Sequence, residues 1–186
     1  IIEIAKIAYN PMRIPKGIEP GLAEKGVFKP DTPSFPNGCH VCGVEIDPAT
    51  GQVRVDRYTA VDDFGTVINQ AIVEGQVHGG IVQGLGQVLM EDAYYDADGQ
   101  LLAGSFMDYA MPRAQDMPWF DVSEHPVPAT TNILGVKGVG EAGTSGSIPS
   151  AMIAILDAMK PLGVPDISMP ATPERVWQAI QDAKSV

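Results

Sequence analysis

A glycine-dense stretch with one carboxylate near its centre is the clearest candidate for chemistry. Residues 135–149 read GVKGVGEAGTSGSIP, and an apolar helix is predicted to follow from Ser150. Glycine lets a backbone approach a ligand closely, and amides before and at a helix N-terminus form an anion-binding concavity. Glu141, held in such a loop, is a candidate general base. The same residues also fit a flexible connection with a solvated Glu141, because glycine loops alone are weak signals.

A second candidate lies on a helix predicted over residues 69–90, where residues 74–86 read EGQVHGGIVQGLG. Five glycines in this helix each lower its intrinsic stability by about 1 kcal/mol relative to alanine. Such a helix needs the close approach of another backbone or of a cofactor. The amides of Gln76 and Gln83 could bond a polar heterocycle. His78 is expected to be a partly buried, satisfied histidine rather than a ligand.

The remaining polar clusters favour structural roles. Cys39 and Cys42 have the C-x-x-C spacing, but a redox motif needs its first sulfur at a helix N-terminus. Here the pair falls in a predicted strand, where the two side chains point to opposite faces, so we expect structural cysteines. Several aspartates at predicted turns are expected to be solvated, namely Asp62, Asp63, Asp92, Asp96 and Asp98.

Composition limits the classes of function. The 186 residues are 45% hydrophobic and carry a net charge of −11, which is typical of a folded globular protein and argues against binding to nucleic acid or anionic membranes. The sequence has no apolar run long enough to span a bilayer. With two cysteines no disulfide framework is indicated, and a reducing, cytoplasmic location is predicted.

The order of strand-like and helix-like stretches along the chain predicts an α+β fold. Short β-hairpins and strands are expected to pack with the glycine-rich helix and two further helices. Residues 1–38 are rich in proline and glycine and are expected to be an irregular segment that wraps over a surface. The chain opens without methionine, which suggests a piece of a longer polypeptide or a split subunit. The predicted strands are 39–46 and 52–61, which form a hairpin, and 92–96, 101–102, 105–109 and 119–122. The last helix is predicted over 173–183.

Six short motifs, and the order in which they occur along the chain, point to a known family. They are FPNGCHV at 35–41, IDPATG at 46–51, YTAVDDFG at 58–65, VEGQVHGG at 73–80, GSFMDYAMPR at 104–113 and KGVGE at 137–141. Together they resemble the C-terminal part of the molybdenum-binding large subunit of the xanthine oxidase family. That family includes aldehyde oxidases, xanthine dehydrogenases and aerobic carbon monoxide dehydrogenases, and the detail is most similar to the bacterial carbon-monoxide-dehydrogenase-like branch.

The resemblance implies a cofactor and a mechanism. Molybdenum is held by a molybdopterin dinucleotide, expected in its cytosine form, and the protein supplies no metal ligand. The glutamate matching Glu141 is the general base in a hydroxylation of an aldehyde or N-heterocycle that uses water. Electrons then pass to 2Fe-2S clusters and FAD on partner subunits. The residues that match cofactor contacts are Gln76, Gly140, Gly143, Thr144, Ser145, Gly146 and Ser147.

The length of the chain departs from the family pattern. The family's large subunit is far longer, and its N-terminal half supplies the loop on the substrate side of the metal. We therefore interpret residues 1–186 as a C-terminal molybdopterin-binding domain that has no turnover in isolation, and carbon monoxide cannot be claimed as its substrate. A non-catalytic scaffold or assembly domain, an inactive fragment, and a module for another nucleotide stay open as alternatives.

Overall fold

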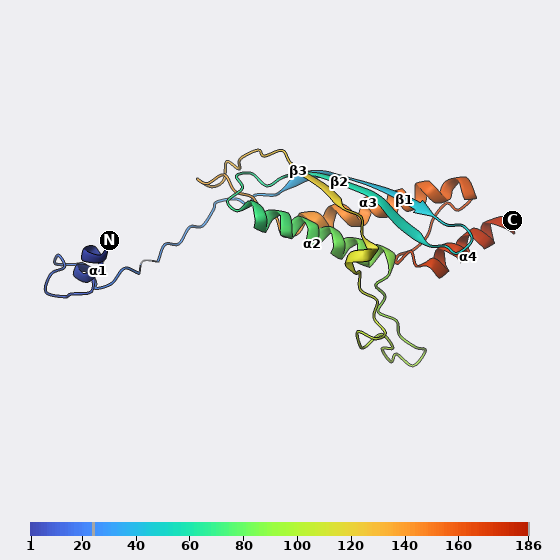
Figure 1. Ribbon diagram of the computed structural model, residues 1–186, viewed down its shortest axis with the longest axis horizontal. Coiled ribbons are helices and arrows are strands. Elements are labelled where there is room, and N and C mark those ends of the chain that lie inside the picture. Colours follow the sequence, from blue (N-terminus) through green and yellow to red (C-terminus); the bar gives the residue numbers. More distant parts are fainter. Residues whose placement is uncertain (24, 186) are drawn as a thin grey trace. The chain divides into compact units, whose positions relative to one another are not determined.

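The computed structural model describes residues 1–23 and 25–185, which divide into two units. The first unit, Ile1–Asp31, contains helix α1 (Ile2–Ala8) followed by turns, and the Gly21 amide donates to the Ala8 carbonyl. The second unit begins at Thr32 and contains the sheet and helices α2 to α4 (Figure 1). Whether residues 1–38 wrap over a surface stays a prediction.

The sheet is built on the predicted hairpin. Strands β1 (Asn37–Ile46) and β2 (Val53–Asp63) pair antiparallel, and β3 (Phe120–Glu124) joins the other edge of β2 in parallel. The Asp47 carboxylate accepts the Ala49 amide at 2.9 Å in the turn between β1 and β2, an arrangement that aspartate favours in turns. The hairpin is thus confirmed, and the third strand gives a mixed sheet in the order β1-β2-β3.

Helices α2 (Gln70–Leu89) and α3 (Ala142–Met159) contact the same face of the sheet. Tyr58 and Phe120 are register partners on β2 and β3, so their side chains share this face. Tyr58 hydrogen-bonds Ser150 of α3, and the ring of Phe120 lies edge-on to His78 of α2. Helix α4 (Pro173–Lys184) completes the core. Residues with no exposed surface in this apolar core are Tyr58, Ala60, Val77, Ile81, Leu85, Val88, Ala151, Ile155, Met159, Val176 and Ile180.

The glycines of α2 allow α3 to approach it closely. A Cβ placed on Gly80 would lie 3.0 Å from the Gly143 Cα, and one placed on Gly143 would lie 2.5 Å from the Val77 carbonyl oxygen. A Cβ on Gly84 would overlap the Ser147 hydroxyl. The expected approach of another backbone is therefore confirmed at these positions. Gly75 and Gly79 have nothing within 4 Å of a Cβ, so they need another explanation.

The predicted boundary between loop and helix after residue 135 was wrong. Helix α3 begins at Ala142 and includes Pro149, so the predicted loop supplies the first two turns of the helix. The glycines at 143 and 146 indicated a loop by their low helix propensity. In the structure, packing overrides that propensity, because each of these glycines lies where a Cβ would meet a neighbouring segment.

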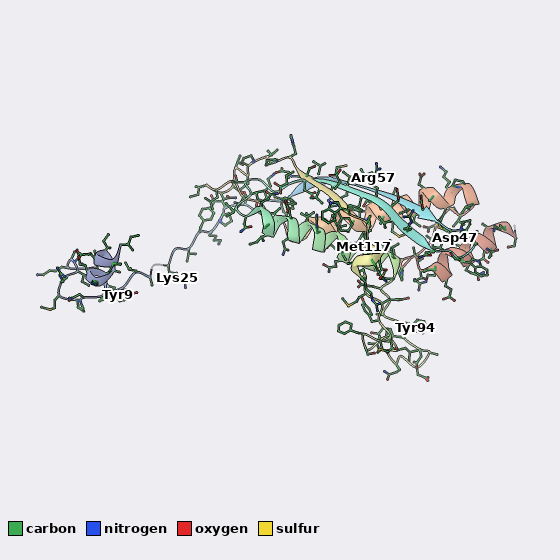
Figure 2. All side chains as sticks on the ribbon, in the orientation of Figure 1. Tyr9, Lys25, Asp47, Arg57, Tyr94 and Met117 are labelled. Atoms are coloured by element: carbon green, nitrogen blue, oxygen red, sulfur yellow. The ribbon has the colours of Figure 1, made fainter. Side chains whose placement is uncertain are left out.

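The segment between α2 and β3 also differs from expectation. Strands were predicted at 92–96, 101–102 and 105–109, but the described residues there contain only the isolated bridge between Tyr95 and Leu101 and a turn after Ser105. The segment extends away from the sheet, as the position of Tyr94 shows (Figure 2). Phe106 and Met107 are 85% and 93% exposed. Their sequence favours a strand, but no described strand in this region pairs with it. The short 3-10 helices η1 (Ala114–Asp116) and η2 (Lys160–Leu162) follow α2 and α3, respectively.

The close contact between α2 and α3 can be tested with two glycine-to-alanine substitutions. Gly143→Ala should destabilise the chain by about 1–3 kcal/mol, because its Cβ would press on the α2 backbone. Gly79→Ala is the matched control and should stabilise the chain by up to about 1 kcal/mol through helix propensity. Urea unfolding followed by circular dichroism measures both changes. A Gly143→Ala variant as stable as the Gly79→Ala control would contradict the close contact.

Candidate active site

A cavity of about 280 Å³ lies where the start of β1, the end of β2 and the start of α3 meet. Its lining residues are Phe35, Pro36, Asn37, Gly38, His40, Asp62, Glu141, Ala142, Ser145 and Gly146. Four of these residues are glycine, alanine or serine, and the ionisable side chains are those of His40, Asp62 and Glu141. The cavity therefore combines accessible backbone with groups that can transfer protons.

Glu141 occupies the position at which α3 begins. Its carbonyl oxygen accepts the first intrahelical bond from the Ser145 amide at 2.9 Å, but its exposed side chain makes no capping bond. The carboxylate is therefore not engaged in its own helix and lines the cavity. A Cβ on Gly140 would lie 3.5 Å from the Gln76 Oε1, so the structure brings Gln76 of α2 next to the segment that carries Glu141.

The other predicted cofactor residues divide between two faces of α3. Ser145 and Gly146 line the cavity with Glu141. Gly143 packs on α2, and the Thr144 hydroxyl donates to the Gly80 carbonyl at 3.1 Å. Ser147 is fully buried and donates to the Thr144 carbonyl at 3.3 Å. The helical period places these residues on different faces of α3. Their contact with a cofactor stays a prediction.

Asp63 ties the segment before Glu141 to the sheet. Its carboxylate pairs with Lys137 Nζ at 2.5 Å and accepts the amides of Gly65 and Val127, each at 2.8 Å. Desolvation raises the pKa of Asp63, but the hydrogen bonds from Lys137, Val127 and Gly65 outweigh it and lower that pKa from 3.8 to about 2. The Lys137 amide also donates to the Phe64 carbonyl at 3.0 Å.

His40 and Asp62 are functional candidates that sequence reasoning missed. The His40 Nε2 lies 3.1 Å from the Asp62 Oδ1, and the two side chains are only 5% and 2% exposed. The expectation that Asp62 and Asp63 are solvated was therefore wrong, because β2 continues to Asp63 and buries both. The signal was present in the alternation of Tyr58, Ala60 and Asp62 on one face of the second hairpin strand.

Cys39, Cys42 and His78 are not among the residues that line the cavity. Cys39 is exposed and Cys42 is half-buried, and both are free thiols. Burial raises the pKa of Cys42 from 9.0 to about 11, which disfavours the reactive thiolate. His78 packs edge-on to Phe120 and Trp119, with ring centroids 5.7 and 6.3 Å away. Within residues 1–23 and 25–185, no three His, Cys, Asp or Glu side chains gather in a way that could hold a metal ion.

Sequence comparison supplies the family. The profile described as "Molybdopterin cofactor-binding domain" matches residues 1–118. The chain belongs to this molybdopterin-binding family. The predicted molybdopterin-binding family is thereby confirmed, and the helices and mixed sheet described above confirm the α+β class. In the part of the chain that the structure describes, no helix has the length and apolar character needed to cross a membrane.

Relatives of this molybdopterin-binding chain are large subunits. It is 38% identical over 180 residues to the carbon monoxide dehydrogenase large chain of Hydrogenophaga pseudoflava, covering 97% of this chain and 22% of the relative. It is 39% identical over 180 residues to the nicotine 6-hydroxylase large subunit of Paenarthrobacter nicotinovorans, covering 96% and 22%. Its structure matches the crystal structure of Cu,Mo-CO dehydrogenase with a TM-score of 0.86 and 34% identity, over 98% of this chain and 23% of that one. The chain thus spans about a fifth of the length of these relatives.

The pairing of Asp63 with Lys137 predicts a pH dependence of stability. Because folding lowers the pKa of this carboxyl to about 2, the ionised group contributes about 2 kcal/mol of stability above pH 4 that is lost as the pH falls toward 2. Asp63→Asn should therefore destabilise the domain at pH 7, and its deficit relative to the unmodified chain should shrink in acid. Urea titrations at several pH values measure this difference.

The control for this experiment is Asp121→Asn, which removes an exposed carboxylate on β3. It should leave the unfolding free energy close to that of the unmodified chain at each pH. A deficit of Asp63→Asn that stays constant from neutral pH to pH 2 would contradict the role of its charge.

Proposed function

We propose that this chain is part of the large subunit of a molybdenum hydroxylase that uses water to hydroxylate an aldehyde or an N-heterocycle. The observation that carries the proposal is the position of Glu141, which precedes the first residue of α3, makes no side-chain capping bond and lines a cavity of about 280 Å³. A general base needs this kind of freedom, because it must reach the proton that it removes. The similarity to large subunits of molybdenum enzymes supports the choice of reaction.

We propose that the wall of this cavity formed by α3 contacts part of a molybdopterin dinucleotide, in its cytosine form. Ala142, Ser145 and Gly146 form a wall of small residues in the first turns of α3. The positive end of the helix dipole at the start of α3 favours anionic groups. Gln76, next to Gly140, adds an amide that can bond a heterocycle. When bound, the cofactor would supply the two-electron redox centre.

In this proposal Glu141 accepts the proton released when the oxygen nucleophile is activated. The contacts of the preceding segment keep it in place for that task. The Gly65–Val136 bridge and the pair between Lys137 and Asp63 fix this segment to the end of β2. Such fixed placement is effective because a misplacement of about 1 Å can cost a catalytic group about 100-fold in rate.

The rest of the substrate pocket and the electron acceptors would be supplied by polypeptide segments outside these 186 residues. We propose that the remainder of the large subunit completes the substrate pocket and that iron-sulfur and FAD subunits take the electrons. The relatives that this chain resembles are more than four times as long, which fits that division.

The isolated 186-residue chain should therefore bind cofactor weakly and show no turnover. Molybdenum analysis and activity assays of the chain, alone and within its complete complex, test this expectation. Turnover by the isolated chain would contradict it.

Glu141→Gln tests the proposed base directly. In the complete enzyme this variant should lower kcat by at least about 100-fold, because a general base contributes on that order. Its molybdenum content should stay near that of the unmodified enzyme, since the amide keeps the size of the side chain. The measurements are steady-state kinetics and metal analysis of the purified complex.

Glu45→Gln is the matched control, because Glu45 is an exposed glutamate that pairs with Arg54 outside the cavity. It should keep full activity. Retained turnover in Glu141→Gln would remove this residue from the mechanism. A complete complex without molybdenum would instead favour a scaffold or assembly domain.

A further inference from the structure

We propose that His40 is a positioning residue for Glu141, acting with Asp62, Tyr58 and Ser150 as a buried network that holds the start of α3 on the sheet. This inference deepens the proposed function and rests on Glu141 being the base. The network joins the lining of the cavity to α3, since His40 and Asp62 line the cavity together with Glu141.

The network runs from the sheet into the helix. Asp62 Oδ1 lies 3.1 Å from His40 Nε2, and His40 Nδ1 lies 2.8 Å from the Tyr58 hydroxyl. The Tyr58 hydroxyl lies 3.1 Å from Ser150 Oγ, which donates to the Ser147 carbonyl at 3.2 Å. Four side chains thus connect the end of β2 to the backbone of α3.

Strand register explains why both ring nitrogens of His40 have partners. His40 is directly opposite Ala60 on β2, and Tyr58 and Asp62 are the diagonal neighbours on the same face. Such diagonal pairs lie within reach of long side chains. The small Ala60 leaves room for the imidazole between them, so the two strands prepare the geometry of the network.

The His40 ring also contacts α3 directly. A Cβ on Gly146 would lie 2.4 Å from His40 Nδ1, and a Cβ on Gly38 would overlap the Asp62 carboxylate. Glycine at these two positions therefore makes room for the pair of His40 and Asp62. Gly146 lies five residues after Glu141, within the first turns of the helix that Glu141 begins.

Burial makes the network a firm connection. Tyr58 has no exposed surface, and desolvation raises the pKa of its hydroxyl above the ordinary value of 10. It therefore stays a phenol that can both donate and accept. Breaking one of these buried bonds leaves an unsatisfied polar group, which is costly, so the network resists small displacements of α3.

The contact with α2 holds the Gly143 and Ser147 face of α3, and later residues of α3 pack in the apolar core with the sheet. The network adds a polar anchor from the sheet at Gly146 and Ser150. Two anchors on different faces set the direction in which Glu141 projects, which is what a general base requires.

Tyr58→Phe in the complete enzyme tests the proposal, because it removes one hydroxyl and keeps the ring. We expect kcat per molybdenum to fall about tenfold or more, with KM within about twofold of the unmodified enzyme and an unchanged molybdenum content. Tyr109→Phe is the matched control, since it also deletes a single bonded hydroxyl, 2.6 Å from Glu91 and outside the cavity. It should keep kcat.

Ser150→Ala provides a second test from the helix side. It should lower kcat in the same way, and the double variant with Tyr58→Phe should be no slower than the slower single variant, because both delete one connection. Full kcat per molybdenum in Tyr58→Phe, or molybdenum loss from both single variants, would overturn the positioning role. An active Glu141→Gln enzyme would instead overturn the proposed base, so the two failures are distinguishable.

Discussion

The close approach of the α2 and α3 backbones is the constraint on which the rest of the structure depends. Gly80 and Gly143 meet at a distance that leaves no room for a side chain. This contact allows the glycine-rich stretch to begin a helix instead of forming a loop, and the helical period then separates its residues. Gly143 and Ser147 face α2, whereas Glu141 and Gly146 line the cavity. The residues that pack on α2 and the residues that line the cavity therefore lie on different faces of the first two turns of α3.

Two adjacent aspartates at the end of β2 show how an acidic chain anchors its site. Successive residues of a strand point to opposite faces, so Asp62 reaches His40 while Asp63 reaches Lys137. Burying a carboxylate is costly unless it is paired and hydrogen-bonded, and each of these has such partners. One pair contacts α3 and the other holds the segment that precedes it. Glu141 follows Lys137 by four residues, and its carboxylate makes no capping bond.

Sequence reasoning succeeded where a pattern is local and failed where a contact is distant. The alternation in residues 39–46 and 52–61 predicted the hairpin, and the pattern of residues 69–90 predicted α2 within one residue at each end. Glu141 could be singled out because it is the sole carboxylate in its stretch. The start of α3 could not, because the glycines that favour a loop locally are required by packing against α2 and His40. The role of Asp62 depends on strand register, which brings residues 40, 58 and 62 together.

The proposed function requires the Glu141 carboxylate to lie beside the reacting centre of a bound molybdenum cofactor. The most direct measurement is a structure of the complete complex, purified with its cofactor in place. We predict a Glu141 oxygen within hydrogen-bond reach of the reacting oxygen, about 2.6–3.2 Å or one water molecule away, with the start of α3 against the cofactor. A cofactor bound elsewhere, or another carboxylate in that position with Glu141 directed into solvent, would contradict the claim.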